Sequence, residues 1–119
     1  DTDAGGVVYH ASYVNFMERA RTEWLRGFGY SNAGLMKELG VVFVVRSLKM
    51  DYLKPALLDD MLSITAQVKE MGRSRLSLLQ SVMRGDELLT EAEVHLVCVS
   101  MATFKPVSVP EILRDQLKD

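Results

Sequence analysis

The hydrophobic pattern of this 119-residue chain changes period once, close to Gly40. Before that point, apolar side chains recur at the three- and four-residue spacing of one helix face. The residues of this stripe are Tyr13, Phe16, Met17, Ala20, Trp24, Leu25 and Phe28. After Gly40, β-branched runs and strict alternation are typical of strands. Helices followed by consecutive strands predict an α+β domain rather than a doubly wound parallel sheet.

Two helices are predicted in the first third of the chain. Ser12 is expected to cap the first, because a serine oxygen can accept hydrogen bonds from the free amides of a helix start. The segment Gly27–Gly29 is expected to end it. The second helix, over residues 31–39, is expected to use Ser31 as its cap and to stop at Gly40. The first helix is the longest and most apolar, so we expect it at the centre of the fold.

Four strands are predicted after Gly40, arranged as a meander of consecutive antiparallel neighbours. Their expected ranges are 42–52, 62–69, 75–83 and 88–101, with a short amphipathic helix over 110–118. Residues 94–99 are nearly all apolar, so the fourth strand is expected to be covered on both faces. We also expect one further strand ahead of Asp1, a single domain over residues 1–119, and dimerisation as cover for a sheet edge.

Composition and charge exclude several classes of protein. Hydrophobic residues make up 48% and charged residues 25%, which is ordinary for a globular chain and argues against disorder. No apolar run approaches the roughly 20 residues of a membrane-spanning helix. A net charge of −2 and a pI near 5.7 argue against nucleic acid as the main partner. A single cysteine, Cys98, excludes an internal disulfide and fits a reducing compartment.

The sequence lacks the motifs of several common catalytic and binding sites. It contains no glycine-rich phosphate loop, no Gly-x-Ser-x-Gly elbow and no histidine and cysteine spacing typical of zinc sites. Cys98 and His95 are three residues apart on a predicted strand, so their side chains point to opposite faces. Cys98 is therefore interpreted as a core residue rather than a nucleophile.

The segment from Asp1 to His10 is the most informative for chemistry. Asp3 lies a few residues before the predicted helix, whose free amides and positive dipole end can stabilise an anion. A carboxylate beside such donors is sufficient for acyl transfer, since it can attack or activate water while the amides hold the carbonyl oxygen. The alternative is that Asp3 is a turn residue and His10 a polar helix start. The residues alone favour that alternative.

A resemblance to a known family instead favours the catalytic interpretation of Asp3 and His10. Residues 1–13, followed by 18–23, resemble the opening motif of hotdog-fold acyl-CoA thioesterases of the 4-hydroxybenzoyl-CoA thioesterase family. They are most similar to its YbgC-type members, which are associated with the bacterial Tol–Pal system. Residues 43–60 and 91–99 are similar to the family's second block and last strand, so the resemblance covers nearly the whole chain.

The resemblance implies a fold, an assembly and a location. In a hotdog, an antiparallel sheet wraps a long central helix, and the family's first strand precedes the aspartate motif. Homodimers or homotetramers with active sites at the subunit interface are expected. A bacterial cytoplasmic enzyme is implied, with a peripheral position at the inner membrane left open.

The resemblance also implies a site, residue by residue. Asp3 matches the catalytic aspartate, as nucleophile or general base. His10 matches the helix-start position whose backbone amide polarises the thioester carbonyl, and its side chain is a further catalytic candidate. Gly6 matches the glycine of the tight loop. Glu18 is a candidate for a polar pocket residue, with a solvated or salt-bridged glutamate equally open.

Coenzyme A carries phosphates, so its binding site is expected to contain cationic side chains. Arg73, Ser74 and Arg75 form a basic turn similar to those that contact the nucleotide in this family, with a solvated hairpin turn as an even alternative. Arg46 is expected either to serve the pocket or to pair with Asp51. Thioester hydrolysis needs only water, so no cofactor and no metal are expected.

The substrate expected from the resemblance is an acyl-CoA, with acyl carrier protein as a candidate partner. Residues that either line an acyl tunnel or simply form core are Val7, Tyr9, Phe16, Trp24, Phe43 and Val45. Two other functions stay open: hydroxyacyl dehydration, and a non-catalytic module that binds acyl-CoA or acyl carrier protein.

Overall fold

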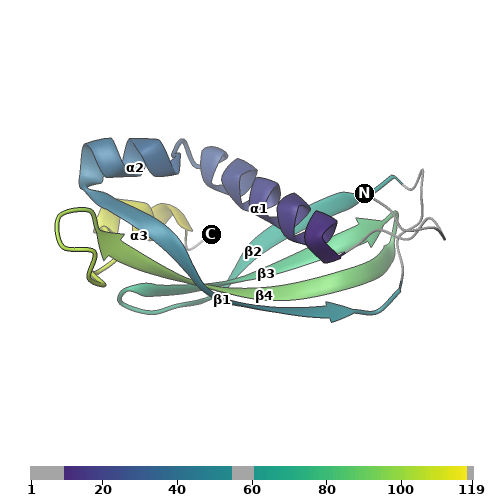
Figure 1. Cartoon of the computed structure of the whole chain (residues 1–119). Coiled ribbons are helices and arrows are strands. Elements are labelled where there is room, and N and C mark those ends of the chain that lie inside the picture. Colours follow the sequence, from purple (N-terminus) through teal and green to yellow (C-terminus); the bar gives the residue numbers. More distant parts are fainter. Residues whose placement is uncertain (1–9, 55–60, 118–119) are drawn as a thin grey trace.

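The structure is a computed structural model that describes residues 10–54 and 61–117. Its elements are α1 (His10–Arg26), α2 (Asn32–Leu39), β1 (Val41–Tyr52), β2 (Ser63–Met71), β3 (Arg75–Arg84), β4 (Glu87–Ser100) and α3 (Glu111–Leu117). Figure 1 shows α1 crossing the concave face of a curved antiparallel sheet, with α2 and α3 gathered near one end of it. The predicted α+β architecture, a long helix wrapped by an antiparallel sheet, is confirmed.

The four strands lie in the order β1-β4-β3-β2. The prediction of a four-stranded meander is therefore wrong in one respect: β1 pairs with β4 and not with β2. The reason is the apolar centre of β4, which needs a strand on each side to satisfy its backbone. On one side, Val44 and Val45 of β1 pair with Val97 and Leu96. On the other side, Leu76 of β3 pairs with Leu96.

The two faces of the sheet have different neighbours. We call the face toward α1 the inner face; it carries the buried side chains of Leu78, Val94 and Cys98. The outer face is the opposite one and carries Val97 and Val99, which are also buried. The prediction that residues 94–99 are covered on both faces is confirmed except at His95, which is half-exposed on the outer face.

The core under the helices divides into two clusters. One contains Met17 of α1 with Val82, Leu89 and Ala92 of the sheet. The other joins α1, α2 and α3 to the opposite half of the sheet. Its buried members are Leu25, Leu35, Val41, Leu76, Leu78, Val94, Leu96, Cys98, Val109, Leu113 and Leu117. Within the described residues, none of the helices has the length and apolarity needed to cross a membrane.

The predicted start of α1 is wrong, whereas the predicted start and end of α2 are confirmed. Helix α1 begins at His10, so Ser12 lies inside it and the predicted cap at Ser12 is wrong. No glycine or proline separates His10 from Ser12, and the helix simply continues further back. For α2 the prediction is confirmed: Ser31 Oγ accepts a hydrogen bond from the Gly34 N–H at 3.0 Å. Gly40 ends α2 with φ 67°.

The left-handed backbone of Gly40 generates a stability prediction. A side chain at this φ is strained by about 1 kcal/mol or more, although no neighbour lies within 4 Å of an added Cβ. Gly40→Ala is expected to lower the free energy of unfolding by about that amount in denaturant titrations at fixed protein concentration. Gly72→Ala is the control, since Gly72 has no positive φ and only ordinary contacts. An equal loss in both variants would contradict the assignment to backbone strain.

The hairpin between β3 and β4 generates a pH prediction. The Glu87 carboxylate accepts hydrogen bonds from Lys54 Nζ and Arg84 Nη2, each at 2.6 Å. These two cations, Lys54 first, lower the pKa of Glu87 from 4.5 to about 2. A depressed carboxyl pKa adds stability that is fully present above about pH 4.5 and is lost as the pH falls toward 2.

Glu87→Gln is therefore expected to reduce the unfolding free energy near neutral pH, and the difference from the parent protein should shrink as the pH falls through this range. The measurement is chemical denaturation at a series of pH values. Glu38→Gln, at an exposed position of α2, is the control. A difference that stays constant down to about pH 2 would contradict the ion-pair origin.

Candidate functional site

Of the predicted catalytic centre, the structure describes only the part at the start of α1. Asp3 and Gly6 lie outside the described residues, and of His10 only the backbone is described, so their roles stay predictions. His10 is the first residue of the 17-residue helix. The first amides of a helix have no helical acceptor and point outward with the positive end of the dipole. The backbone N–H of His10 is therefore in a position to bind an anionic oxygen.

A pocket of about 330 Å³ lies between α1 and β1, and we call it the α1–β1 pocket. The exposed Glu18 is one of its lining residues. Of the six residues predicted to line an acyl tunnel or form core, Trp24, Phe43 and Val45 line this pocket. Phe16 lines another hollow, against β2, and Val7 and Tyr9 lie outside the described residues. The other lining residues of the α1–β1 pocket are Arg21, Thr22, Leu25, Ser31, Asn32, Leu78 and Leu96.

Arg21 and Gln80 form a polar link beside this pocket that sequence reasoning missed. Arg21 Nη1 donates to Gln80 Oε1 at 2.8 Å, and Gln80 Nε2 donates to the Met17 carbonyl at 3.0 Å. Gln80 is fully buried on the inner face of β3. Burial lowers the pKa of Arg21, and the charge of Glu18 opposes this shift. The available signal was a glutamine in phase with the buried Leu78 and Val82 of the same strand.

The predicted basic turn is present, but its three residues point to different surroundings. The turn is closed by the Gly72 N–H, which donates to the Arg75 carbonyl at 2.8 Å. Arg73 Nε donates to Ser108 Oγ at 2.8 Å. Arg114 Nη2 of α3 donates to the carbonyls of Gly72 and Arg73 at 2.9 and 2.8 Å. Arg73 is thus held against the segment that leads to α3.

Ser74 and Arg75 instead line a hollow on the outer face, together with Arg46. Arg46 occupies the β-bulge between Val45 and Ser47 of β1. It lines this hollow together with Arg75, and the described residues show no ion pair between Arg46 and Asp51. We call this the outer hollow; its volume is about 450 Å³. Its remaining lining residues are Val44, Val97, Val99, Phe104 and Pro106.

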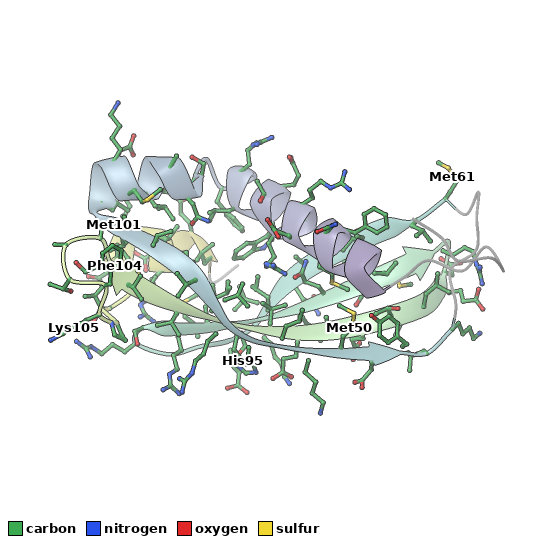
Figure 2. The ribbon with its side chains drawn as sticks, in the orientation of Figure 1. Met50, Met61, His95, Met101, Phe104 and Lys105 are labelled. Carbon is green, nitrogen blue, oxygen red and sulfur yellow. The ribbon has the colours of Figure 1, made fainter. Side chains whose placement is uncertain are left out.

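Phe104 is the second feature that sequence reasoning missed. It lies on the loop that follows β4 (Figure 2), is 71% exposed and has φ 57°, a left-handed backbone that is uncommon outside glycine. An exposed aromatic ring beside two arginines suits a ligand that combines a flat ring with negative charge.

A hydrogen-bonded network crosses the outer face next to this hollow. His95 contacts Glu93 Oε2 through Nε2 at 2.7 Å and Ser77 Oγ through Nδ1 at 3.2 Å. Lys69 Nζ donates to Glu93 Oε1 at 2.5 Å. The hydrogen bonds from Lys69, first, and His95 lower the pKa of Glu93. Ser77 is almost fully buried, so this Ser-His-Glu arrangement does not offer an accessible nucleophile.

Cys98 faces the other side of the sheet from His95. Figure 2 shows His95 on the face away from α1, and Cys98 is fully buried in the core beneath the helices. Burial raises the pKa of its thiol, which disfavours the nucleophilic thiolate. The prediction that these two residues form no catalytic pair, and that Cys98 is core, is confirmed. Elsewhere in the described ranges, no group of three or more histidine, cysteine, aspartate or glutamate residues is placed to hold a metal ion.

Comparison with known proteins decides the family. A family profile described as the thioesterase-like superfamily matches residues 1–117. The chain belongs to the thioesterase-like superfamily. This protein is 48% identical to an Escherichia coli protein named acyl-CoA thioester hydrolase YbgC, over 99% of its own length and 88% of that relative's. The family resemblance predicted from the motifs is confirmed.

Solved structures agree with this membership. A probable thioesterase from Bartonella henselae superimposes with a TM-score of 0.82 and 32% identity, covering 91% of this chain and 89% of that one. A Thermus thermophilus thioesterase complexed with coenzyme A and Zn has a TM-score of 0.82 and 27% identity, covering 99% of this chain and 84% of that one. The hotdog fold predicted for this thioesterase-like protein is thereby confirmed.

Proposed function

We propose that this thioesterase-like protein hydrolyses acyl-CoA thioesters to a free acid and coenzyme A. The observation that carries the proposal is the 48% identity, along nearly the whole chain, to an acyl-CoA thioester hydrolase. The start of α1 supports it physically, because outward-facing amides at the first turn suit the negative oxygen that develops when a thioester carbonyl is attacked.

In the proposed mechanism Asp3 acts in one of two ways. As a general base it takes a proton from water, whose oxygen attacks the thioester carbon. As a nucleophile it attacks that carbon itself, and water then hydrolyses the mixed anhydride. In both routes the carbon–sulfur bond breaks and the thiolate of coenzyme A leaves and is protonated. The His10 N–H stabilises the oxyanion, and Gly6 lets the backbone approach the substrate closely.

The nucleotide end of coenzyme A is assigned to the outer hollow. Ser74, Arg75 and Arg46 surround it, and guanidinium groups pair well with phosphate oxygens. The exposed ring of Phe104 suits stacking against adenine. Arg73 has a smaller role in this proposal because Ser108 already occupies its Nε. The Thermus thioesterase was solved in complex with coenzyme A, which supports coenzyme A as a ligand of this protein.

The assembly is proposed to be a homodimer, or a homotetramer of paired dimers, whose active sites are completed at the interface. β1 is an edge strand of the described sheet and leaves Val44 and Val45 42% and 49% exposed. An edge strand with unpaired backbone groups and exposed apolar side chains is prone to pair with another chain, which supports this assembly. We place the enzyme in the cytoplasm, with acyl carrier protein thioesters as alternative substrates.

The central prediction concerns Asp3. Asp3→Asn is expected to lower kcat/KM by about 100-fold or more, because the variant loses its base or nucleophile. The measurement is thiol release from a panel of acyl-CoAs from acetyl to palmitoyl, with benzoyl types included. Asp86→Asn, an exposed carboxylate in the β3–β4 hairpin, is the matched control and should retain activity.

Two outcomes would overturn the proposal. A folded, oligomeric parent protein that releases thiol from no substrate would indicate a binding module. A product that mass spectrometry identifies as a dehydrated acyl-CoA would indicate a different hotdog chemistry.

A second prediction concerns the phosphates. Arg75→Met is expected to raise KM for acyl-CoA about ten-fold with a small change in kcat, because hydrogen bonds to charged groups are worth about 1.5–3 kcal/mol. The same variant should leave KM for acyl-pantetheine, which has no phosphates, close to the parent value. Arg26→Met, at an exposed position at the end of α1, is the control. An equal rise of KM for both substrates would exclude a phosphate contact.

A further inference from the structure

Arg21 occupies a position of α1 that the helix geometry reserves for an apolar side chain. Met17 and Leu25 are both buried against the sheet, and Arg21 lies four residues from each, on the same face of the helix. It therefore interrupts the buried stripe at its middle. Met17 belongs to one core cluster and Leu25 to the other, so Arg21 lies between the two clusters along the helix.

Half-burial of the Arg21 guanidinium carries a desolvation cost. Taking a charge out of water costs several kcal/mol unless an opposite charge or a full set of hydrogen bonds compensates it. Gln80 accepts one hydrogen bond from Arg21 but carries no charge. Guanidinium has five N–H donors. In the part of the chain that the structure describes, no ion pair within 4 Å joins Arg21 to a carboxylate, and Glu18 acts on it only over a longer distance.

Gln80 fixes the direction of the guanidinium. It is fully buried and is itself anchored, because its Nε2 donates to the Met17 carbonyl of α1. The glutamine therefore acts as a positioning residue that holds Arg21 beside the α1–β1 pocket. Arg21 and Glu18 both line that pocket, opposite the apolar Phe43, Leu78 and Leu96. A few fixed polar groups in an otherwise apolar pocket are what orient a ligand.

We propose that the α1–β1 pocket receives the acyl group of the substrate and that Arg21 and Glu18 recognise a hydroxyl near the distal end of that group. A hydroxyl accepts from Arg21 and donates to Glu18, so it uses both members of the pair. A carboxylate at the same place would be repelled by Glu18. A plain hydrocarbon end would desolvate the guanidinium further without adding an acceptor to the one that Gln80 supplies. This inference rests on the proposed thioesterase activity.

The helix also sets the length of the acyl group. His10, which begins α1 and binds the thioester oxygen in the proposed mechanism, lies about 16 Å from Arg21 along the axis at 1.5 Å per residue. Helical side chains lean back toward the N-terminus, which shortens the distance to be bridged. The matching substrate is an aliphatic acyl chain of medium length with its hydroxyl near the far end, rather than next to the thioester.

The test compares three CoA thioesters of one chain length: decanoyl, 10-hydroxydecanoyl and decanedioyl. For the parent protein, kcat/KM for the hydroxy substrate is expected to exceed that of the other two by about ten-fold. Arg21→Met should reduce the ratio of hydroxy to plain substrate to about one. Gln80→Met should reduce the same ratio, because it releases the guanidinium from its anchor. Glu18→Gln should raise the relative rate with decanedioyl-CoA.

Controls separate this inference from a structural role and from the proposed function. Arg19→Met changes the exposed neighbour of Glu18 on α1 and should keep the parental ratio. If Arg21→Met fails to fold, Arg21→Lys replaces it, and inhibition of the parent protein by 10-hydroxydecanoate should be stronger than by decanoate. Equal rates for plain and hydroxy substrates, or a preference for the dicarboxylic one, would overturn the inference and leave the thioesterase intact. No thiol release from any substrate would overturn both.

Discussion

The seating of α1 on the inner face of the sheet is the constraint on which the rest of this structure depends. Met17 and Leu25 bury two separate parts of the helix, each in its own cluster. Gln80 holds the turn between them by donating to the Met17 carbonyl. A buried glutamine is acceptable only when its donor and its acceptor are both used, and here both are. The helix is thereby fixed in position as well as buried, which in turn fixes the pocket that it forms with β1.

Local sequence signals predicted the parts of the fold that local interactions control. The cap at Ser31 and the stop at Gly40 were both predictable, because one side chain or one backbone angle decides them. The alternation of half-buried and exposed residues along β2 was predictable for the same reason, since each strand residue faces one side. The family resemblance added the wrapping of the sheet around α1, which periodicity alone had only suggested.

Features that depend on long-range contacts were not predictable in this way. The pairing of β1 with β4 joins residues far apart in the sequence, and nothing in β1 itself excludes β2 as its neighbour. The separation of Arg73 from Arg75 depends on Ser108 and Arg114, which belong to the far end of the chain. Arg21 was not identified from the sequence, because its place in the stripe shows only when Met17 and Leu25 are known to be the buried pair.

The two candidate ligand surfaces meet at one point of the edge strand. Val45 lines the α1–β1 pocket on the inner side of β1, and the next residue, Arg46, lines the outer hollow from the bulge. Because Val45 and Arg46 are consecutive, one strand supplies side chains to both surfaces, which lie on opposite faces of the sheet. The same strand forms an edge of the described sheet and exposes Val44 and Val45, which supports pairing with a second subunit along β1 in the proposed assembly. A change in the position of β1 would therefore act on both candidate ligand surfaces and on the proposed subunit contact at once.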